Sequence, residues 1–434
     1  MLSKIANIFR VPDLKKKVLF TAFILVLYRL GSFIPVPGVN PTVLGQIFSN
    51  NSEGILGLVD LFAGGNMSRA SVFALGIMPY ITASIVIQLL GSVVPYFEKL
   101  KKEGAEGQKK VTQLTRYGTV LVAGLNSIGI CVMLLSQPGI VTVNHAFFFV
   151  STVITLITGV MIIMWLGEQI TEKGIGNGIS LIIFAGIIAR LPSEIYGLFQ
   201  KVAANPTIGN IFMIIFIFVA IVVVTAAVIL VTEAMRKIPV QYAKRVIGRK
   251  VYGGQSTYIP LRVNTAGVIP IIFAQSVLMF PITIIRFFNT DSNFVTKWFS
   301  PGTALYTVLS MLLIVFFAYF YTAMVMNPVD MADNMKKYGG FIPGVKQGKK
   351  TAEYINRVLV RITLPGAIFY AIIAVMPDIL FRILGVHLSV LGGTSIIIVV
   401  GVALDTLQQI ESHLVSRHYD GFMKRGKLRG RAGR

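Results

Sequence analysis

The chain has 434 residues, of which 54% are hydrophobic and only 13% are charged. Soluble domains are about 45–50% apolar and about 25% charged, so this composition excludes an ordinary water-soluble domain. The formal net charge is nevertheless +22, and the chain has a single cysteine. One cysteine cannot pair within the chain, which excludes an internal disulfide framework and leaves no sign of an oxidising compartment.

Segment 1–17 is basic and amphipathic, which is compatible with a helix lying on a membrane surface. The apolar stretch after it leads into Pro35 and Pro37 without a cleavage site of the A-x-A type. We therefore expect a retained first span rather than a cleaved signal peptide.

Long apolar stretches recur along the rest of the chain. Residues 208–232 and 303–326 carry no charge, and each exceeds the roughly 20 residues with which a helix crosses ~30 Å of hydrocarbon. Arg190, Pro192 and Glu194 interrupt another such stretch, the fifth. The sequence predicts ten spans, near 18–34, 71–92, 114–136, 147–167, 178–200, 208–232, 266–288, 303–326, 363–385 and 391–410.

The approach to the second span differs from the others. Gly64 and Gly65 break an apolar segment, polar residues follow as far as Arg69, and the apolar stretch then resumes with Pro79 inside it. This pattern predicts a short, separate segment in front of a helix of membrane length. The glycines of 174–178 predict a tight turn that opens the fifth span.

Lysine and arginine are unevenly distributed between the two sides of these spans. They are concentrated in the N-terminal segment, in the connection between spans two and three, in two long loops and in the C-terminal tail 412–434. Because such loops face the cytoplasm, both termini are expected on the cytoplasmic side, as the even number of spans also requires.

The two long basic loops, 233–262 and 327–362, allow two interpretations. Their charge suits orientation and attraction to anionic lipid headgroups. It equally suits docking of a large anionic partner such as a ribosome, whose phosphates attract basic side chains regardless of sequence. Glycine-containing turns inside both loops indicate folded, protruding fingers.

Catalytic patterns are weak or missing. Residues 344–351 resemble a phosphate-binding loop, but the spacing is one residue short and no strand is expected before it. Asp405 is a candidate intramembrane acid, although a hydrogen-bonded role beside Gln408 and Gln409 is the simpler interpretation. Ionisable groups in mid-span are scarce, and Arg29 can reach the membrane interface. A pathway through such spans would have apolar and weakly polar walls, unlike that of an ion-coupled pump.

Seven motifs resemble the SecY/Sec61-alpha family in order and spacing, over nearly the whole chain. They are RLGSFIPVPG at 29–38, GGNMSRASVFALGIMPYI at 64–81, WLGEQITEKGIGNGISLIIFAGI at 165–187, YAKR at 242–245, QSTYIPLRVN at 255–264, AGVIP at 266–270 and GGTS at 392–395.

The resemblance implies an all-α polytopic membrane protein whose ten helices form two pseudo-symmetric five-helix halves around an hourglass pore. The halves would be 18–200 and 208–411. The implied function is a passive channel in the bacterial plasma membrane, which translocates unfolded secretory polypeptides and releases transmembrane segments laterally into the lipid. No enzymatic activity and no cofactor are implied, since energy would come from partners.

The resemblance also assigns residues to the pore. A ring of aliphatic side chains would separate to let a moving polypeptide through. With no polypeptide present, it would exclude water from the constriction and so oppose ion flow. A plug at about 57–67 would block the ring, with Gly64 and Gly65 giving it freedom to move and few apolar contacts holding it. The implied ring is Ile77, Ile81, Ile179, Ile183, Ile272 and Ile398; the plug is Asp60, Leu61, Phe62, Ala63, Gly64, Gly65, Asn66 and Met67; the lateral gate has Thr82, Gln88 and Asn264.

Implied partners are SecE-type and SecG-type subunits, the motor ATPase SecA, the ribosome, membrane lipids, and unfolded preproteins with their signal sequences. One departure affects the tip of the second loop, where Lys346-Gln347-Gly348 stands in place of the family's usual Arg-Pro-Gly. Lysine lacks the planar fork of arginine, so a specific arginine contact is not carried over. The residues expected to bind SecA or the ribosome are Lys244, Arg245, Arg249 and Lys250 in the first loop, Lys346, Lys349 and Lys350 at the tip of the second, and Arg357.

Two other classes of function remain open at this point. One is a secondary transporter of an amphiphilic substrate, and the other is an intramembrane enzyme that uses Asp405. Translocation of a secretory precursor separates the channel from the transporter, and an Asp405→Asn variant tests the enzyme.

Overall fold

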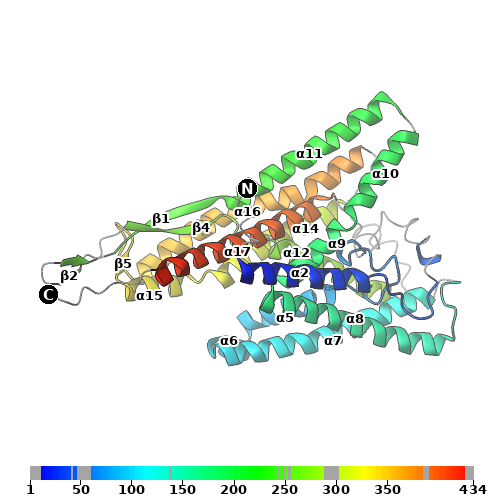
Figure 1. Cartoon of the computed structure of the whole chain (residues 1–434), viewed down its shortest axis with the longest axis horizontal. Coiled ribbons are helices and arrows are strands. Elements are labelled where there is room, and N and C mark those ends of the chain that lie inside the picture. Colours follow the sequence, from blue (N-terminus) through cyan, green and yellow to red (C-terminus); the bar gives the residue numbers. More distant parts are fainter. Residues whose placement is uncertain are drawn as a thin grey trace. The chain divides into compact units, whose positions relative to one another are not determined.

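The computed structural model describes residues 11–40, 43–45, 60–135, 139–204, 206–242, 245–247, 250–252, 256–287, 303–384 and 391–425 (Figure 1). Backbone packing divides the chain into two compact units. The first comprises Met1–Ser52, Val59–Arg190 and Val402–Arg434, and the second comprises Glu53–Leu58 and Leu191–Gly401. The pseudo-symmetric halves 18–200 and 208–411 stay a prediction.

The first unit is a helical bundle in which α7 packs against α5 and α8, and α8 packs against α9 and α2. The C-terminal part of α17 also belongs to this unit, from Val402 onward. The helices are α2 (Pro12–Gly31), α5 (Met78–Val93), α6 (Pro95–Lys102), α7 (Ala105–Leu135), α8 (His145–Lys173), α9 (Gly178–Ile188) and α17 (Gly393–Arg425).

The second unit is also mainly helical, with α14 packed against α12 and α16, and α11 against α10 and α16. Its helices are α10 (Leu191–Ala204), α11 (Ile208–Glu233), α12 (Ile269–Phe287), α14 (Ala304–Val325), α15 (Pro328–Lys337) and α16 (Lys349–Ile383).

Within the described residues, seven helical stretches are long and apolar enough to cross a membrane, and α5 and part of α12 are shorter apolar helices. Together with α2, these place a helix at each of the ten positions where the sequence predicts a span. The interruption of the fifth span is confirmed, because α9 ends at Ile188 and α10 begins at Leu191, with Pro192 in its first turn.

The second span begins later than its hydropathy suggests. Residues 72–77 form turns rather than helix, and α5 starts at Met78 with Pro79 in its first turn. The expected start at residue 71 is therefore wrong. Gly76 has a φ of +55° in the left-handed region, and a Cβ there would lie 2.9 Å from the Cα of Ala63. The chain thus folds back on the preceding segment before the helix can begin.

The turn at 174–178 is present as predicted. Asn177 caps α9, since its side-chain oxygen accepts hydrogen bonds from the N–H groups of Ile179 and Ser180. Gly176 has a φ of +89°, and its N–H donates to the side-chain oxygen of Gln409 on α17 at 2.9 Å. This contact fastens α17 to the turn within the first unit.

A small antiparallel sheet joins the two long basic loops, which were expected to form folded, protruding fingers. Its strands are β1 (Met235–Tyr242), β4 (Ser256–Arg262) and β5 (Gly340–Phe341), in the order β4-β1-β5. A hairpin of β2 (Arg245–Ile247) and β3 (Lys250–Tyr252) lies between β1 and β4 in the sequence. We call the sheet of β4, β1 and β5 the basic sheet; it lies beside α15 (Figure 1).

The basic sheet has a hydrophobic core of its own. Alternating side chains of β1 and β4 are buried against α15 and α16, as strand periodicity requires. Both long loops contribute to this core, so neither folds independently of the other. The buried residues are Ile238, Val240, Leu261, Met335, Ile342, Ile355 and Leu359.

Two prolines occur inside these strands without breaking them. Pro239 pairs with Tyr258 and Pro260 pairs with Lys237, so the two pairs are two residues apart in register. Antiparallel pairs alternate between hydrogen-bonded and non-hydrogen-bonded ones, and one phase of the ladder therefore accommodates both prolines. β4 is an edge strand, and Pro260 then removes a donor from its free edge, which protects the edge against pairing with other chains.

Candidate functional site

The segment Asp60–Met67, called here the plug segment, is packed into the first unit. The side chains of Leu61, Phe62, Ala63 and Met67 are all buried, with at most 6% of their surface exposed. The expectation that few apolar contacts hold this segment is therefore wrong. Residues 57–59, which were also expected to belong to the plug, lie outside the described residues.

A buried carboxylate organises the plug segment. Oδ1 of Asp60 accepts hydrogen bonds from the N–H groups of Met67 and Ser68, each at 2.9 Å. Oδ2 of Asp60 forms an ion pair with Nη1 of Arg190, also at 2.9 Å. The Asp60 side chain is 4% exposed and that of Arg190 is 24% exposed. The carboxylate thus closes the plug segment on itself and also ties it to the residues just after α9.

Two hydrogen bonds connect the plug segment to α2. Nη1 of Arg29 donates to the carbonyl oxygen of Gly64 at 3.1 Å, and Nδ2 of Asn66 donates to the hydroxyl of Tyr28 at 3.2 Å. Arg29 therefore contacts the plug segment directly, which its position in the first span did not suggest. Its guanidinium also lies 5.5 Å from the ring centre of Phe33.

The backbones of the plug segment and α9 touch at a pair of glycines. Gly64 has a φ of +73°, and a Cβ placed on it would lie 2.9 Å from the Cα of Gly186. The same distance separates a Cβ on Gly186 from the Cα of Gly64. Only glycine fits at either position without a shift of the backbone.

Four of the six predicted ring residues lie in the first unit and two in the second. Ile77 immediately precedes α5 and Ile81 lies one turn into it, and both are buried. Ile183 of α9, Ile272 of α12 and Ile398 of α17 are also buried.

Ile179 is half-buried. Its Cγ1 lies 3.4 Å from the position of a Cβ on Gly167, so this side chain packs toward α8. That the six residues meet in one ring stays a prediction.

The predicted gate residues make local hydrogen bonds. The hydroxyl of Thr82 donates to the carbonyl oxygen of Met78 at 3.1 Å, and Nδ2 of Asn264 donates to that of Gly267 at 3.0 Å. Nε2 of Gln88 donates to the hydroxyl of Ser84 at 2.9 Å. Oε1 of Gln88 is buried without a hydrogen-bond partner. Of the three residues, Gln88 alone therefore keeps a buried acceptor available for a gate contact.

The predicted docking residues of the first loop are only partly described. Arg245 begins β2 and Lys250 begins β3, whereas Lys244 and Arg249 lie outside the described residues. In the hairpin, Arg245 pairs with Tyr252 and Lys250 pairs with Ile247. Arg245 and Lys250 therefore stand on the two neighbouring strands of one short ladder.

In the second loop, Lys346, Lys349, Lys350 and Arg357 are all exposed. Only Lys346 lies in the turn, because Lys349 and Lys350 are the first residues of α16, which corrects their placement at a loop tip. Nζ of Lys350 forms an ion pair with Glu353 at 3.0 Å. The charges of Lys346, in the turn, and of Lys349, at the start of α16, stay outside this ion pair.

Gln347, which replaces the family's usual proline, has a structural role here. Its Nε2 donates to the carbonyl oxygen of Gly340 in β5 at 3.3 Å. The hydroxyl of Thr351 donates to the carbonyl oxygen of Lys346 at 2.9 Å, which closes the turn from the other side. A hydrogen bond thus supplies part of the rigidity that the ring of a proline would have provided.

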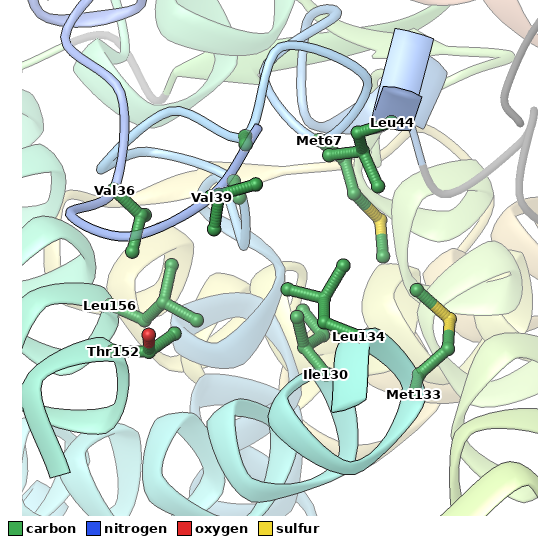
Figure 2. Close-up of a pocket in the computed structure, with 11 residues that line it drawn as sticks. Val36, Val39, Leu44, Met67, Ile130, Met133, Leu134, Thr152 and Leu156 are labelled. Carbon is green, nitrogen blue, oxygen red and sulfur yellow. The ribbon is translucent and has the colours of Figure 1, made fainter. Parts of the chain in front are cut away.

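A small pocket lies against the plug segment within the first unit. Figure 2 shows apolar side chains around it, with Met67 from the plug segment and Leu134 from α7 among them. Its volume of about 20 Å³ has room for roughly one water molecule. This space is too small for a substrate and lies beside the plug segment as a minor packing defect.

Sequence reasoning missed Arg190, Tyr28 and Gly186 as partners of the plug segment. In the sequence, Arg190 stands out only as an interruption of the fifth span. A signal existed, since a charged residue is costly inside an apolar stretch and calls for a partner of opposite sign. Asp60 stands in a second apolar stretch, and pairing the two opposite charges would have suggested the contact.

The fold and this site define a multi-spanning helical membrane protein in which a short buried segment is held by contacts with α2, with α9 and with the residue that follows α9 by two positions. A family model described as SecY matches residues 71–407. The protein translocase subunit SecY of Rickettsia bellii (strain RML369-C) is 46% identical over 427 residues, which cover 96% of this chain and 97% of that protein. The subunit of Escherichia coli (strain K12) is 45% identical over 428 residues, 96% of each chain.

The chain therefore belongs to the SecY family, as its motifs indicate. Membership in this family of translocase subunits sets it apart from the intramembrane enzyme that Asp405 suggested.

Solved structures agree on the fold. A protein-conducting channel aligns with a TM-score of 0.68 at 17% identity, covering 95% of this chain and 94% of that one. Sec61 in the canine ribosome–channel complex aligns with a TM-score of 0.63 at 16% identity, again covering 95% and 94%. The predicted helical, multi-spanning channel fold is thereby confirmed.

Proposed function

We propose that this chain is the channel-forming subunit of a bacterial protein translocase. It passes unfolded secretory polypeptides across the plasma membrane and releases transmembrane segments sideways into the lipid. The observation that carries the proposal is the near full-length similarity to translocase subunits, combined with a plug segment seated by its own polar contacts. The alternative of a secondary transporter loses its basis, because the family match spans most of the chain.

The seal of the idle channel would have two parts. The six isoleucines would form an apolar constriction that excludes water and ions when no chain is present and offers a passing polypeptide no hydrogen bond. The plug segment would block this constriction from one side. For a solved relative, the plug domain of SecY is described as stabilising the closed state and maintaining a membrane seal.

The lateral gate would use polar residues on α5 and before α12. Gln88 is the strongest candidate, because its buried Oε1 lacks a hydrogen-bond partner. Thr82 and Asn264 already bond to nearby carbonyl groups. Their side chains would change partner only if the gate opened.

The partners would dock on the basic sheet and the turns beside it. Both long loops share one core there, and β5 of the second loop pairs with β1 of the first. Sec61 and yeast Ssh1 have been solved in complexes with ribosomes. For this chain we propose docking of the ribosome and the ATPase SecA, together with SecE-type and SecG-type subunits in the membrane, and both termini in the cytoplasm.

The proposal is tested by reconstituting the complex in lipid vesicles with SecA and ATP. A secretory precursor is expected to become protected from added protease in an ATP-dependent manner. Vesicles that lack the complex and vesicles without ATP serve as controls. Absence of protection, with the partner subunits shown to be present, would contradict the channel.

Docking on the second loop makes a further prediction. Lys346→Gln and Lys349→Gln are expected to weaken ribosome binding more than Lys350→Gln, because the charge of Lys350 is already paired with Glu353. Binding is measured at several salt concentrations, and the slope of log affinity against log salt should fall by about 0.7–0.9 for each phosphate that the variant no longer neutralises. Equal affinities for the three variants and the wild type would assign this turn to membrane orientation alone.

A further inference from the structure

The plug segment sits in a strongly basic environment. Arg29, Arg69 and Arg190 are close enough to interact electrostatically, and Arg69 stacks at 4.6 Å on the same Phe33 ring as Arg29. Asp60 is the only acidic residue of the plug segment. Its carboxylate therefore provides the negative charge that this cluster of arginines requires.

Asp60 makes two kinds of polar contact, hydrogen bonds from nearby backbone N–H groups and an ion pair with a residue far away in the sequence. The N–H groups of Met67 and Ser68 lie seven and eight residues further along the same segment of chain, so their hydrogen bonds can stay intact if this segment moves as one piece. The ion pair with Arg190 joins residues that are 130 positions apart and links the plug segment to the end of α9. Displacement of the plug segment must break this ion pair, whatever happens inside the segment.

The pair of glycines explains why the plug segment comes close enough to α9 for this ion pair to form. Gly64 and Gly186 bring the two backbones together, and Arg190 lies two residues beyond the end of α9, with its Cδ 3.5 Å from the position of a Cβ on Gly65. The arginine side chain is therefore presented along the same side as the contact, where it meets the Asp60 carboxylate.

We infer that the Arg190–Asp60 ion pair is a latch that holds the plug segment in its seat, with Arg190 as the positioning residue. The inference rests on the proposed function, since a latch has meaning only in a channel with a movable plug. The partial exposure of Arg190 suits this role. A partly hydrated ion pair biases the closed state, yet it can open once both charges reach water, unlike a fully buried pair.

The latch is tested through the resting ion conductance of the reconstituted complex in planar bilayers. Asp60→Asn keeps an oxygen for the two backbone N–H groups but removes the charge, and Arg190→Gln removes the other charge. Each is expected to raise the resting conductance roughly five-fold or more, because the buried Asp60 carboxylate makes this ion pair stronger than one between exposed groups. The double variant should leak no more than either single variant, because both remove the same interaction.

Three further variants make the result interpretable. Arg190→Lys keeps the charge and should restore most of the seal, which a merely structural defect would not allow. Arg116→Gln breaks a different ion pair of the first unit, that with Glu168 outside the plug segment, and it should leave the conductance unchanged. Deletion of residues 60–67 gives the reference leak of a channel without its plug segment.

The possible outcomes separate the latch from the proposed function. A leaky deletion with unchanged Asp60→Asn and Arg190→Gln channels would overturn the latch and leave the channel standing. Additive leaks in the double variant would likewise overturn it. A deletion that does not leak would overturn the plug itself, and the latch with it.

Discussion

Replacing Gly64 by alanine is expected to raise the resting conductance of the channel to nearly that of a plug deletion. The φ of +73° alone costs an alanine about 1–2 kcal/mol. The added Cβ would also lie 2.9 Å from both the Cα of Gly186 and the hydroxyl of Tyr28. The backbone contact with α9 cannot relax as a flexible side chain can, so the plug segment must leave its seat.

Gly65→Ala is the matched control for this prediction. Gly65 has a similar φ of +78°, but a Cβ there would meet only the side chain of Arg190, at 3.5 Å. Backbone strain is therefore common to both variants, and the close approach to α9 belongs to Gly64 alone. Planar-bilayer conductance and precursor translocation are measured for each. If both variants raised the conductance equally, backbone strain rather than the lost contact with α9 would explain the leak.

The positions of the helices could be predicted from hydropathy because a bilayer requires about 20 apolar residues for each span. The break between α9 and α10 was equally accessible, since Pro192 and the charged residues around it are visible in the sequence. The start of α5 could not be predicted in this way. The folding of Gly76 onto Ala63 excludes helix before Met78, and hydropathy carries no information about such a tertiary contact.

The plug segment could be located from its motif, but the way it is held could not. Loose packing is the natural expectation for so short a segment, whereas Leu61 and Ala63 are each 1% exposed. The ion pair of Asp60 with Arg190 links two stretches that are far apart in sequence. Sequence spacing cannot reveal such pairs, although the presence of two opposite charges in apolar surroundings restricts the choices.

The basic sheet escapes prediction for a different reason. β5 has only two residues, and it pairs with β1 about a hundred positions earlier in the chain. Pro239 and Pro260 argue against strands when the sequence is considered alone. Their register shows why they are tolerated, but register becomes known only when both strands are seen together.

Because the two long loops share one core, damage to one should disable both. Leu261 of β4 is fully buried beside residues of α15 and α16. Leu261→Ala is expected to destabilise the basic sheet by about 2–5 kcal/mol, as for other large-to-small changes in a core. Backbone hydrogen exchange should then accelerate at Gly340 and Phe341 in the other loop, and ribosome binding should weaken.

Thr257→Ala is the control, since Thr257 lies on the same strand with its side chain exposed. It should leave hydrogen exchange and binding near their wild-type values. The resting conductance should be unchanged in both variants, because the plug segment is bound by residues of the first unit. Faster exchange in β4 with unchanged exchange in β5 would show that the loops fold separately. The docking surface would then have to be assigned to each loop by itself rather than to a shared sheet.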